Sequence, residues 1–141
     1  MLLADVNVLV YAYAEAAPRH TEFRDWLRAT VESESAFAIS DLVLSGFVRV
    51  ITNPRVFDPP MPTERAISAA DALRSRANCV VVSPGDRHWE IFLRLCREGG
   101  VKGNLVSDAY FAALAIETGS EWITTDSDYA RFPGLRWRHP F

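Results

Sequence analysis

Apolar residues along this chain alternate between short continuous runs and longer stretches with a helical period. Short uninterrupted apolar runs are typical of buried strands, whereas apolar residues every three or four positions indicate helices that cover a core. The short runs predict strands at Leu2–Ala4, Phe37–Ile39, Val80–Val82, Trp122–Thr124 and, last, around Leu135–Trp137. The helical pattern predicts helices at Val8–Glu15, His20–Val31, Leu42–Thr52, Thr63–Arg76, Arg87–Glu98 and Leu105–Thr118.

Residues with strong preferences for helix ends mark several of these limits. Asp41 and Thr63 are expected to be N-caps, and Gly99 and Gly119 are expected to end helices. The segment 54–62 contains four prolines and is therefore predicted to be a loop. Apolar strands separated by helices predict a three-layer α/β/α fold, in which a mainly parallel sheet is covered on both faces.

Composition narrows the class of protein further. With 141 residues, 49% of them apolar, the chain is expected to form one domain spanning residues 1–141. The formal net charge of −3 means that any contact with nucleic acid must be local. Cys79 and Cys96 lack the spacing of a zinc or redox site. The apolar start has no basic leader, and no run of about 20 apolar residues could span a membrane, so a cytoplasmic location is expected.

Aspartates follow two of the predicted strands. Asp5 comes directly after the first strand, where it can cap the next helix or face a ligand at the carboxyl edge of a parallel sheet. Asp126 and Asp128 follow the fourth strand, where they can instead form an Asx turn. Because the carboxyl ends of parallel strands meet at one edge, these acids are expected to share a pocket.

A further aspartate, Asp108, lies near the start of a helix that is apolar nearly all round. Its stripe of the helix contains Ala112, Ala115 and Gly119, so the carboxylate is expected to face small residues and not solvent. Burying an ionised carboxylate is costly unless a cation or hydrogen-bond donors compensate. The alternative is a first-turn acid that the helix dipole stabilises.

A cluster of these aspartates would offer a ligand only carboxylate oxygens. Clustered carboxylates repel one another, which raises their pKa values unless a divalent cation neutralises them. Oxygen donors select hard ions, so Mg²⁺ is the expected cofactor and Mn²⁺ a possible substitute. Such a site is suited to the hydrolysis of phosphodiesters, because the ion can activate a water molecule.

Four segments together resemble the PIN-domain ribonucleases and, within them, the VapC toxins of bacterial toxin–antitoxin pairs. They are LLADVNVLVYA, FVRVITNPRVF, VKGNLVSDAYFAALAIETG and WITTDSDYARFPGLRWRHPF, in the order and spacing typical of the family. The resemblance implies a three-layer α/β/α fold, Mg²⁺-dependent endoribonuclease activity on RNA, a homodimer, and neutralisation by a VapB-type antitoxin. By position, it implies that Asp5 and Asp108 are the principal metal ligands, that Asp126 is a further ligand and that Asp128 assists through water.

One position departs from the pattern of this family. The family usually has a glutamate in the helix after the second strand, where this chain has Gly46. Asp41 lies five residues earlier, about 140° around a helix, so it cannot replace that glutamate without local rearrangement. The gap implies a site with one strongly bound ion rather than two.

Two basic residues are candidates for contact with RNA phosphate. Arg49 lies one turn beyond Gly46, although an arginine on a helix surface can equally be solvated. Lys102 lies in a glycine-rich segment ahead of a helix, where a phosphate could bind, although the glycines can equally serve as a helix stop.

Two other functions remain open from the sequence. Asp5-Val6-Asn7 is similar to the D-x-D motif of haloacid-dehalogenase-like phosphatases, in which Asp5 would be a nucleophile, but it lacks the second aspartate. The missing glutamate at Gly46 also allows a catalytically weak domain that binds RNA or antitoxin without cutting.

Overall fold

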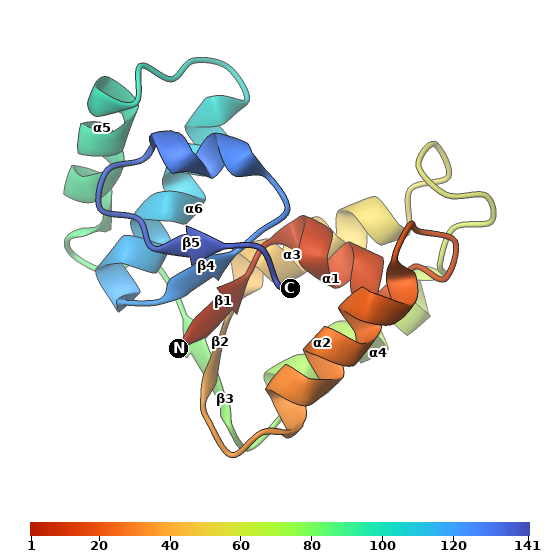
Figure 1. Ribbon diagram of the computed structural model, residues 1–141. Coiled ribbons are helices and arrows are strands. Elements are labelled where there is room, and N and C mark those ends of the chain that lie inside the picture. Colours follow the sequence, from red (N-terminus) through yellow and green to blue (C-terminus); the bar gives the residue numbers. More distant parts are fainter.

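The computed structural model describes residues 1–141 and has a five-stranded sheet at its centre (Figure 1). The strands are β1 (Leu2–Ala4), β2 (Phe37–Ser40), β3 (Cys79–Val82), β4 (Glu121–Ile123) and β5 (Trp137–Arg138). Their order in the sheet is β3-β2-β1-β4-β5, and every neighbouring pair is parallel.

Helices cover the sheet on both sides. They are α1 (Val6–Tyr13), α2 (His20–Glu32), α3 (Asp41–Ile51), α4 (Thr63–Arg74), α5 (His88–Glu98), α6 (Leu105–Thr118) and the short 3-10 helix η1 (Ser127–Arg131). In Figure 1, α1 to α4 lie on one side, and α5, α6 and η1 lie on the other. The predicted three-layer α/β/α class is therefore confirmed. None of the helices combines the length and apolar composition that crossing a membrane would require.

The order of the strands places a ligand site at one particular point. The chain moves outward from β1 to β3 and then returns to the other side of β1 with β4. Right-handed crossovers put the helices of these two halves on opposite faces. The reversal between β1 and β4 is a switch point, where open parallel sheets bind ligands beyond the carboxyl ends of their strands.

The core explains the apolar pattern of the central strands. It contains 33 buried apolar residues, and Leu3 of β1 and Trp122 of β4 are fully buried because both faces of the sheet are covered. At the edge of the sheet, Val80 and Val81 of β3 are 40% and 41% exposed. The apolar run thus predicts the strand correctly, although it does not reveal that the strand lies at an edge.

Two predicted N-caps are wrong by one residue. Ser40 caps α3, because its hydroxyl accepts a hydrogen bond from the Leu42 backbone N–H, and Asp41 is the first residue of the helix. Ser40 has the extended backbone of a strand end, which is the geometry that an N-cap needs. Thr63 is likewise the first residue of α4, and Pro62 precedes it without a side-chain cap.

Other limits agree with the sequence more closely. Gly99 and Gly119 are the C-caps of α5 and α6, as predicted, and Gly119 has a left-handed φ of 66° that favours glycine. Residues 54–62 contain no helix or strand, as predicted. Helix α1 begins at Val6, two residues earlier than predicted, because Asp5 supplies its cap.

Candidate functional site

A cavity of about 440 Å³ lies at the carboxyl edge of the sheet. Asp5, Asp108 and Asp126 all line it, from the end of β1, the first turn of α6 and the segment after β4. Gly46 and Arg49 of α3 line another part of the same cavity. The structure therefore brings together aspartates that three separate parts of the chain supply, at the switch point between β1 and β4.

Asp5 is the most constrained of these acids. It is 7% exposed, and both of its carboxylate oxygens accept hydrogen bonds. The donors are the Val6 backbone N–H, 2.6 Å from Oδ1, and the Thr124 hydroxyl, 2.7 Å from Oδ2. Burial, aided by the charges of Asp108 and Asp126, raises the pKa of Asp5 from 3.8 to about 6. Asp5 thus caps α1 and also lines the cavity, so its two predicted roles are compatible.

Asp108 is more open than the sequence predicts. Ala112 and Ala115, on the same stripe of α6, are fully buried, but Asp108 itself is only partly buried. The prediction that this carboxylate is shielded from solvent is therefore wrong, because the first turn of α6 borders a cavity and not the core. The Tyr129 hydroxyl donates a hydrogen bond to Asp108 Oδ1 at 3.3 Å. Burial and the charge of Asp126 raise the pKa of Asp108.

Asp126 and Asp128 differ in their surroundings. Asp126 Oδ1 accepts a hydrogen bond from the Asp128 backbone N–H at 2.8 Å, so the predicted Asx turn is present, and Asp126 also lines the cavity. Asp128 is exposed and is not part of the lining. Asp128 is therefore placed beside the cavity and Asp126 within it.

Two further residues belong to this site, although the apolar pattern does not point to them. Thr124 is fully buried; its hydroxyl donates to Asp5 and accepts from the Asp126 backbone N–H at 3.0 Å. Tyr129 is 2% exposed, and its burial, with the nearby charge of Asp5, raises its pKa, so the phenol stays protonated. The only signal in the sequence is the polar Thr124-Thr125 pair at the end of an apolar run.

The position of the missing glutamate is closely packed. A Cβ at Gly46 would lie 2.8 Å from Val6 Cγ2, so any side chain there requires Val6 to move. Asp41, the only acid of α3, accepts a hydrogen bond from Arg74 Nε at 2.7 Å and does not line the cavity. No other carboxylate of this helix therefore replaces the family's glutamate.

The two predicted phosphate contacts are placed differently. Arg49 is exposed at the cavity and forms no ion pair within the chain. Its guanidinium is therefore available to an anionic ligand. Lys102 is also exposed, in the segment before α6, but it is not part of the lining.

The donor set is suited to a hard cation that keeps part of its water shell. No group of three or more His, Cys, Asp or Glu side chains is arranged to hold a metal ion by itself. Mg²⁺ is commonly held by one or two carboxylates, with water and substrate phosphate completing its shell. A divalent cation would stabilise the ionised form of the buried Asp5, because it would offset the repulsion from the two neighbouring carboxylates. The chemistry of these residues is thus compatible with a hard divalent cation such as Mg²⁺.

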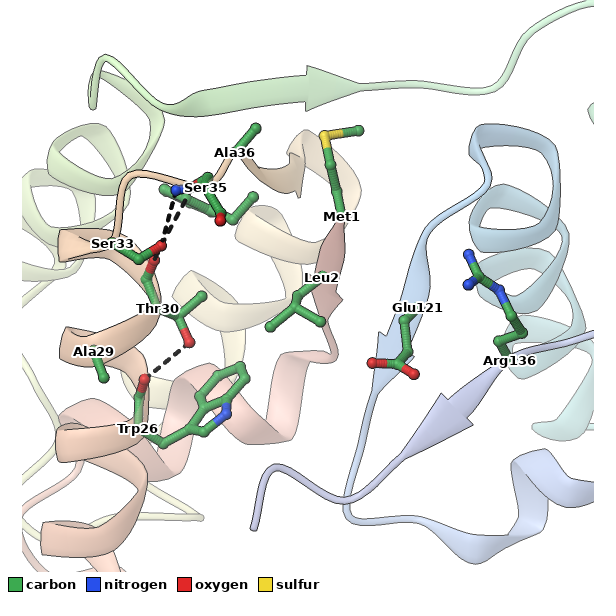
Figure 2. Close-up of a pocket in the computed structure, with 11 residues that line it drawn as sticks. Met1, Leu2, Trp26, Ala29, Thr30, Ser33, Ser35, Ala36, Glu121 and Arg136 are labelled. Carbon is green, nitrogen blue, oxygen red and sulfur yellow. Dashed lines mark hydrogen bonds between the residues drawn. The ribbon is translucent and has the colours of Figure 1, made fainter.

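A second cavity, of about 670 Å³, lies at the opposite, amino edge of the sheet. Figure 2 shows Trp26 and Thr30 of α2 on one side of it, and Glu121 and Arg136 on the other. Arg136 donates a hydrogen bond to the Gly119 carbonyl at 2.8 Å, and Glu121 accepts one from Arg138 Nε at 2.9 Å. The only carboxylate of this cavity, Glu121, is therefore already paired with a cation of the chain, whereas Arg136 is bound to a neutral carbonyl.

The fold and the acidic cavity agree with comparisons to known proteins. The family model of the PIN domain matches residues 2–135. Ribonuclease VapC43 of Mycobacterium tuberculosis is 41% identical over 140 residues, which cover 99% of this chain and 95% of that protein. Ribonuclease VapC25 of the same species is 34% identical, with 99% of both chains covered. The chain therefore belongs to the PIN-domain family and, within it, to the VapC ribonucleases.

Solved structures share the same fold. VapBC2 from Rickettsia felis, bound to a DNA fragment from its promoter, matches with a TM-score of 0.71 at 19% identity, covering 98% of this chain and 97% of that chain. VapC20 from Mycobacterium tuberculosis, described as a sarcin-ricin loop cleaving toxin, matches with a TM-score of 0.64 at 19% identity, covering 96% and 99%. Membership of the PIN-domain family removes the haloacid-dehalogenase-like phosphatase from the alternatives.

Proposed function

We propose that this protein is a Mg²⁺-dependent endoribonuclease of the VapC type, which hydrolyses phosphodiester bonds in RNA. The observation that carries this proposal is the convergence of Asp5, Asp108 and Asp126 on one cavity at the switch point of the sheet. The names of its relatives, which are ribonucleases, support the same conclusion. Mn²⁺ is expected to replace Mg²⁺, because both are hard ions that oxygen donors bind.

Each residue of the cavity has a proposed part in this reaction. Asp5 and Asp108 would be the principal ligands of Mg²⁺, Asp126 a further ligand, and Asp128 would act through water. When bound, Mg²⁺ acts as a Lewis acid on the phosphate and lowers the pKa of a water molecule. The hydrogen bonds to both oxygens of Asp5 fix the direction of that carboxylate before any ligand arrives.

Contact with the RNA backbone is assigned to basic residues. The Arg49 guanidinium, exposed at the cavity and without a partner, is suited to two parallel hydrogen bonds with a phosphate. Lys102, in the segment before α6, is proposed as a second contact further from the cavity. Both would act on the phosphate backbone and carry no information about base sequence.

Cleavage of RNA by the purified protein tests this function directly. We expect cleavage with Mg²⁺, none with EDTA, and recovery when Mg²⁺ or Mn²⁺ is added in excess. Asp5→Asn, purified in the same way, is the control for a contaminating nuclease. If the wild type binds its antitoxin but cuts no RNA at high concentration, the catalytically weak binding domain that Gly46 allows would be the better description.

We further propose that the protein is a cytoplasmic homodimer that a VapB-type antitoxin neutralises. Structural neighbours include VapBC from Salmonella typhimurium, solved bound to DNA. A cleft of about 430 Å³ between α1, α2 and α4 has Leu27 and Leu73 in its lining, with the exposed Arg28 and Arg65 beside them. This combination suits an amphipathic antitoxin helix with acidic flanks.

The partner proposal is tested by measuring the mass of the protein in solution. Light scattering with size exclusion is expected to give twice the chain mass for the protein alone, and a larger complex when its VapB-type antitoxin is added. Arg28→Glu combined with Arg65→Glu should weaken the complex and leave RNA cleavage intact. An unchanged complex would place the antitoxin elsewhere.

A further inference from the structure

The two principal acids of the cavity are held very differently. Asp5 accepts one hydrogen bond on each carboxylate oxygen. Asp108 accepts a single one, on Oδ1, and its donor is the Tyr129 hydroxyl at 3.3 Å. Asp108 is also the more exposed of the two, so fewer neighbours restrict the rotation of its side chain. The orientation of Asp108 therefore depends on the single hydrogen bond from Tyr129, whereas two donors hold Asp5.

The ring of Tyr129 is itself fixed. It packs against Trp122, with 5.5 Å between the ring centroids, and against Phe132, with 5.9 Å. Tyr129 is 2% exposed, yet it is part of the cavity lining. A ring held in this way keeps its hydroxyl at one place, and the hydrogen bond to Asp108 is the only one that this hydroxyl forms.

We propose that Tyr129 is a positioning residue, whose hydroxyl holds Asp108 Oδ1 so that the second oxygen, Oδ2, is free to act as a ligand in the cavity. Tyr129 acts through Asp108, since a phenol packed in the core has its only polar contact with that carboxylate. Partners that orient a ligating side chain typically change metal affinity by about 10- to 100-fold. This role rests on the proposed function, because it assigns Asp108 to a metal site.

Tyr129→Phe keeps the ring and removes only the hydroxyl. Binding of Mn²⁺ to metal-free protein, measured by calorimetry without RNA, is expected to weaken by about 10-fold. The midpoint of urea denaturation in EDTA should change little, because the ring packing remains. Tyr11→Phe is the matched control: the Tyr11 ring packs against Phe23, and its hydroxyl forms no hydrogen bond, so Mn²⁺ affinity should be unchanged.

A crystal structure of metal-free Tyr129→Phe gives a second readout that needs no activity. We expect Asp108 in more than one conformer, or turned away from its wild-type position, while Asp5 stays in place. Wild-type Mn²⁺ affinity and an unmoved Asp108 in the variant would overturn the role of Tyr129 and leave the proposed function standing. A wild-type protein that binds no Mn²⁺ would overturn the metal site, and the role of Tyr129 with it.

Discussion

The two ends of the parallel sheet carry cavities that differ in size and in charge. The amino-edge cavity is the larger, about 670 Å³ against about 440 Å³, but its only carboxylate, Glu121, already forms an ion pair with Arg138. The carboxyl-edge cavity has three aspartates, and none of them forms an ion pair. The smaller cavity is thus the one whose carboxylates lack a cation within the chain.

Carboxylates without a cation, and not cavity volume, therefore distinguish the candidate site. A carboxylate that the chain leaves without a cation has a free-energy cost, which a bound ion can reverse. A cavity whose only carboxylate is already paired with an arginine has no such cost to remove.

The largest effect is expected for Asp5→Asn. Loss of a principal ligand should slow RNA cleavage by at least about 100-fold, since even partners that only orient a ligand cost up to that much. Glu121→Gln, at the amino edge, is the matched control and should cleave at the wild-type rate. Single-turnover rates with Mg²⁺ decide between the two ends, and equal rates for Asp5→Asn and the wild type would contradict the assignment.

The stability of the metal-free protein should fall as the pH rises from about 4 to about 7. The pKa of Asp5 is about 6 in the fold and 3.8 without it, so the folded protein binds more protons in this range and deprotonation favours unfolding. Ionisation of Asp5 destabilises the fold by about 3 kcal/mol; this cost is absent below about pH 4 and complete above about pH 7. Urea denaturation in EDTA measures it, and Asp5→Asn should flatten the curve. Parallel curves for the two proteins would show that Asp5 carries no such cost.

Close packing between Gly46 and Val6 should make Gly46→Ala destabilising. The new Cβ would lie 2.8 Å from Val6 Cγ2, an overlap that costs about 2 kcal/mol of unfolding free energy. Combining it with Val6→Ala should recover part of that loss, so that the double variant is more stable than the sum of the single effects. Chemical denaturation measures all three variants. Strict additivity would mean that positions 6 and 46 do not compete for space.

The smallest effect is expected for Arg49→Ala. Loss of one phosphate contact should weaken RNA binding by several-fold and lower the slope of affinity against salt by about 1. Arg136→Ala, at the amino edge, should change neither quantity. Fluorescence anisotropy in the cleavage-deficient Asp5→Asn background measures both, and an unchanged salt slope in Arg49→Ala would remove Arg49 from the RNA contact.

Features set by local sequence were predicted well. Helix α6 spans Leu105–Thr118, as predicted, because its apolar composition is continuous and Gly119 ends it with a positive φ. The placement of Asp5 and Asp126 at strand ends follows from the same local pattern. Since the carboxyl ends of parallel strands meet at one edge, the pattern also predicts that these acids share a cavity.

Features set by the direction of side chains were not predicted. The Thr124 hydroxyl reaches Asp5 across 119 residues of sequence, and Tyr129 reaches Asp108 across 21. Neither contact leaves a periodic signal, because each depends on how two packed elements face one another. The prediction that Asp108 is shielded from solvent was wrong for the same reason. Helical spacing shows which residues lie on one face of a helix, but not how far along the helix the core extends.

The pairing of β1 with β4 also sets the time at which the site can form. Asp5 is translated 119 residues before Thr124, and the hydrogen bond that fixes Asp5 needs the Thr124 hydroxyl. A growing polypeptide therefore lacks an assembled site until β4 and the residues that follow it have been made. For a protein proposed to be a toxin, this order delays RNA cleavage until those residues have been made.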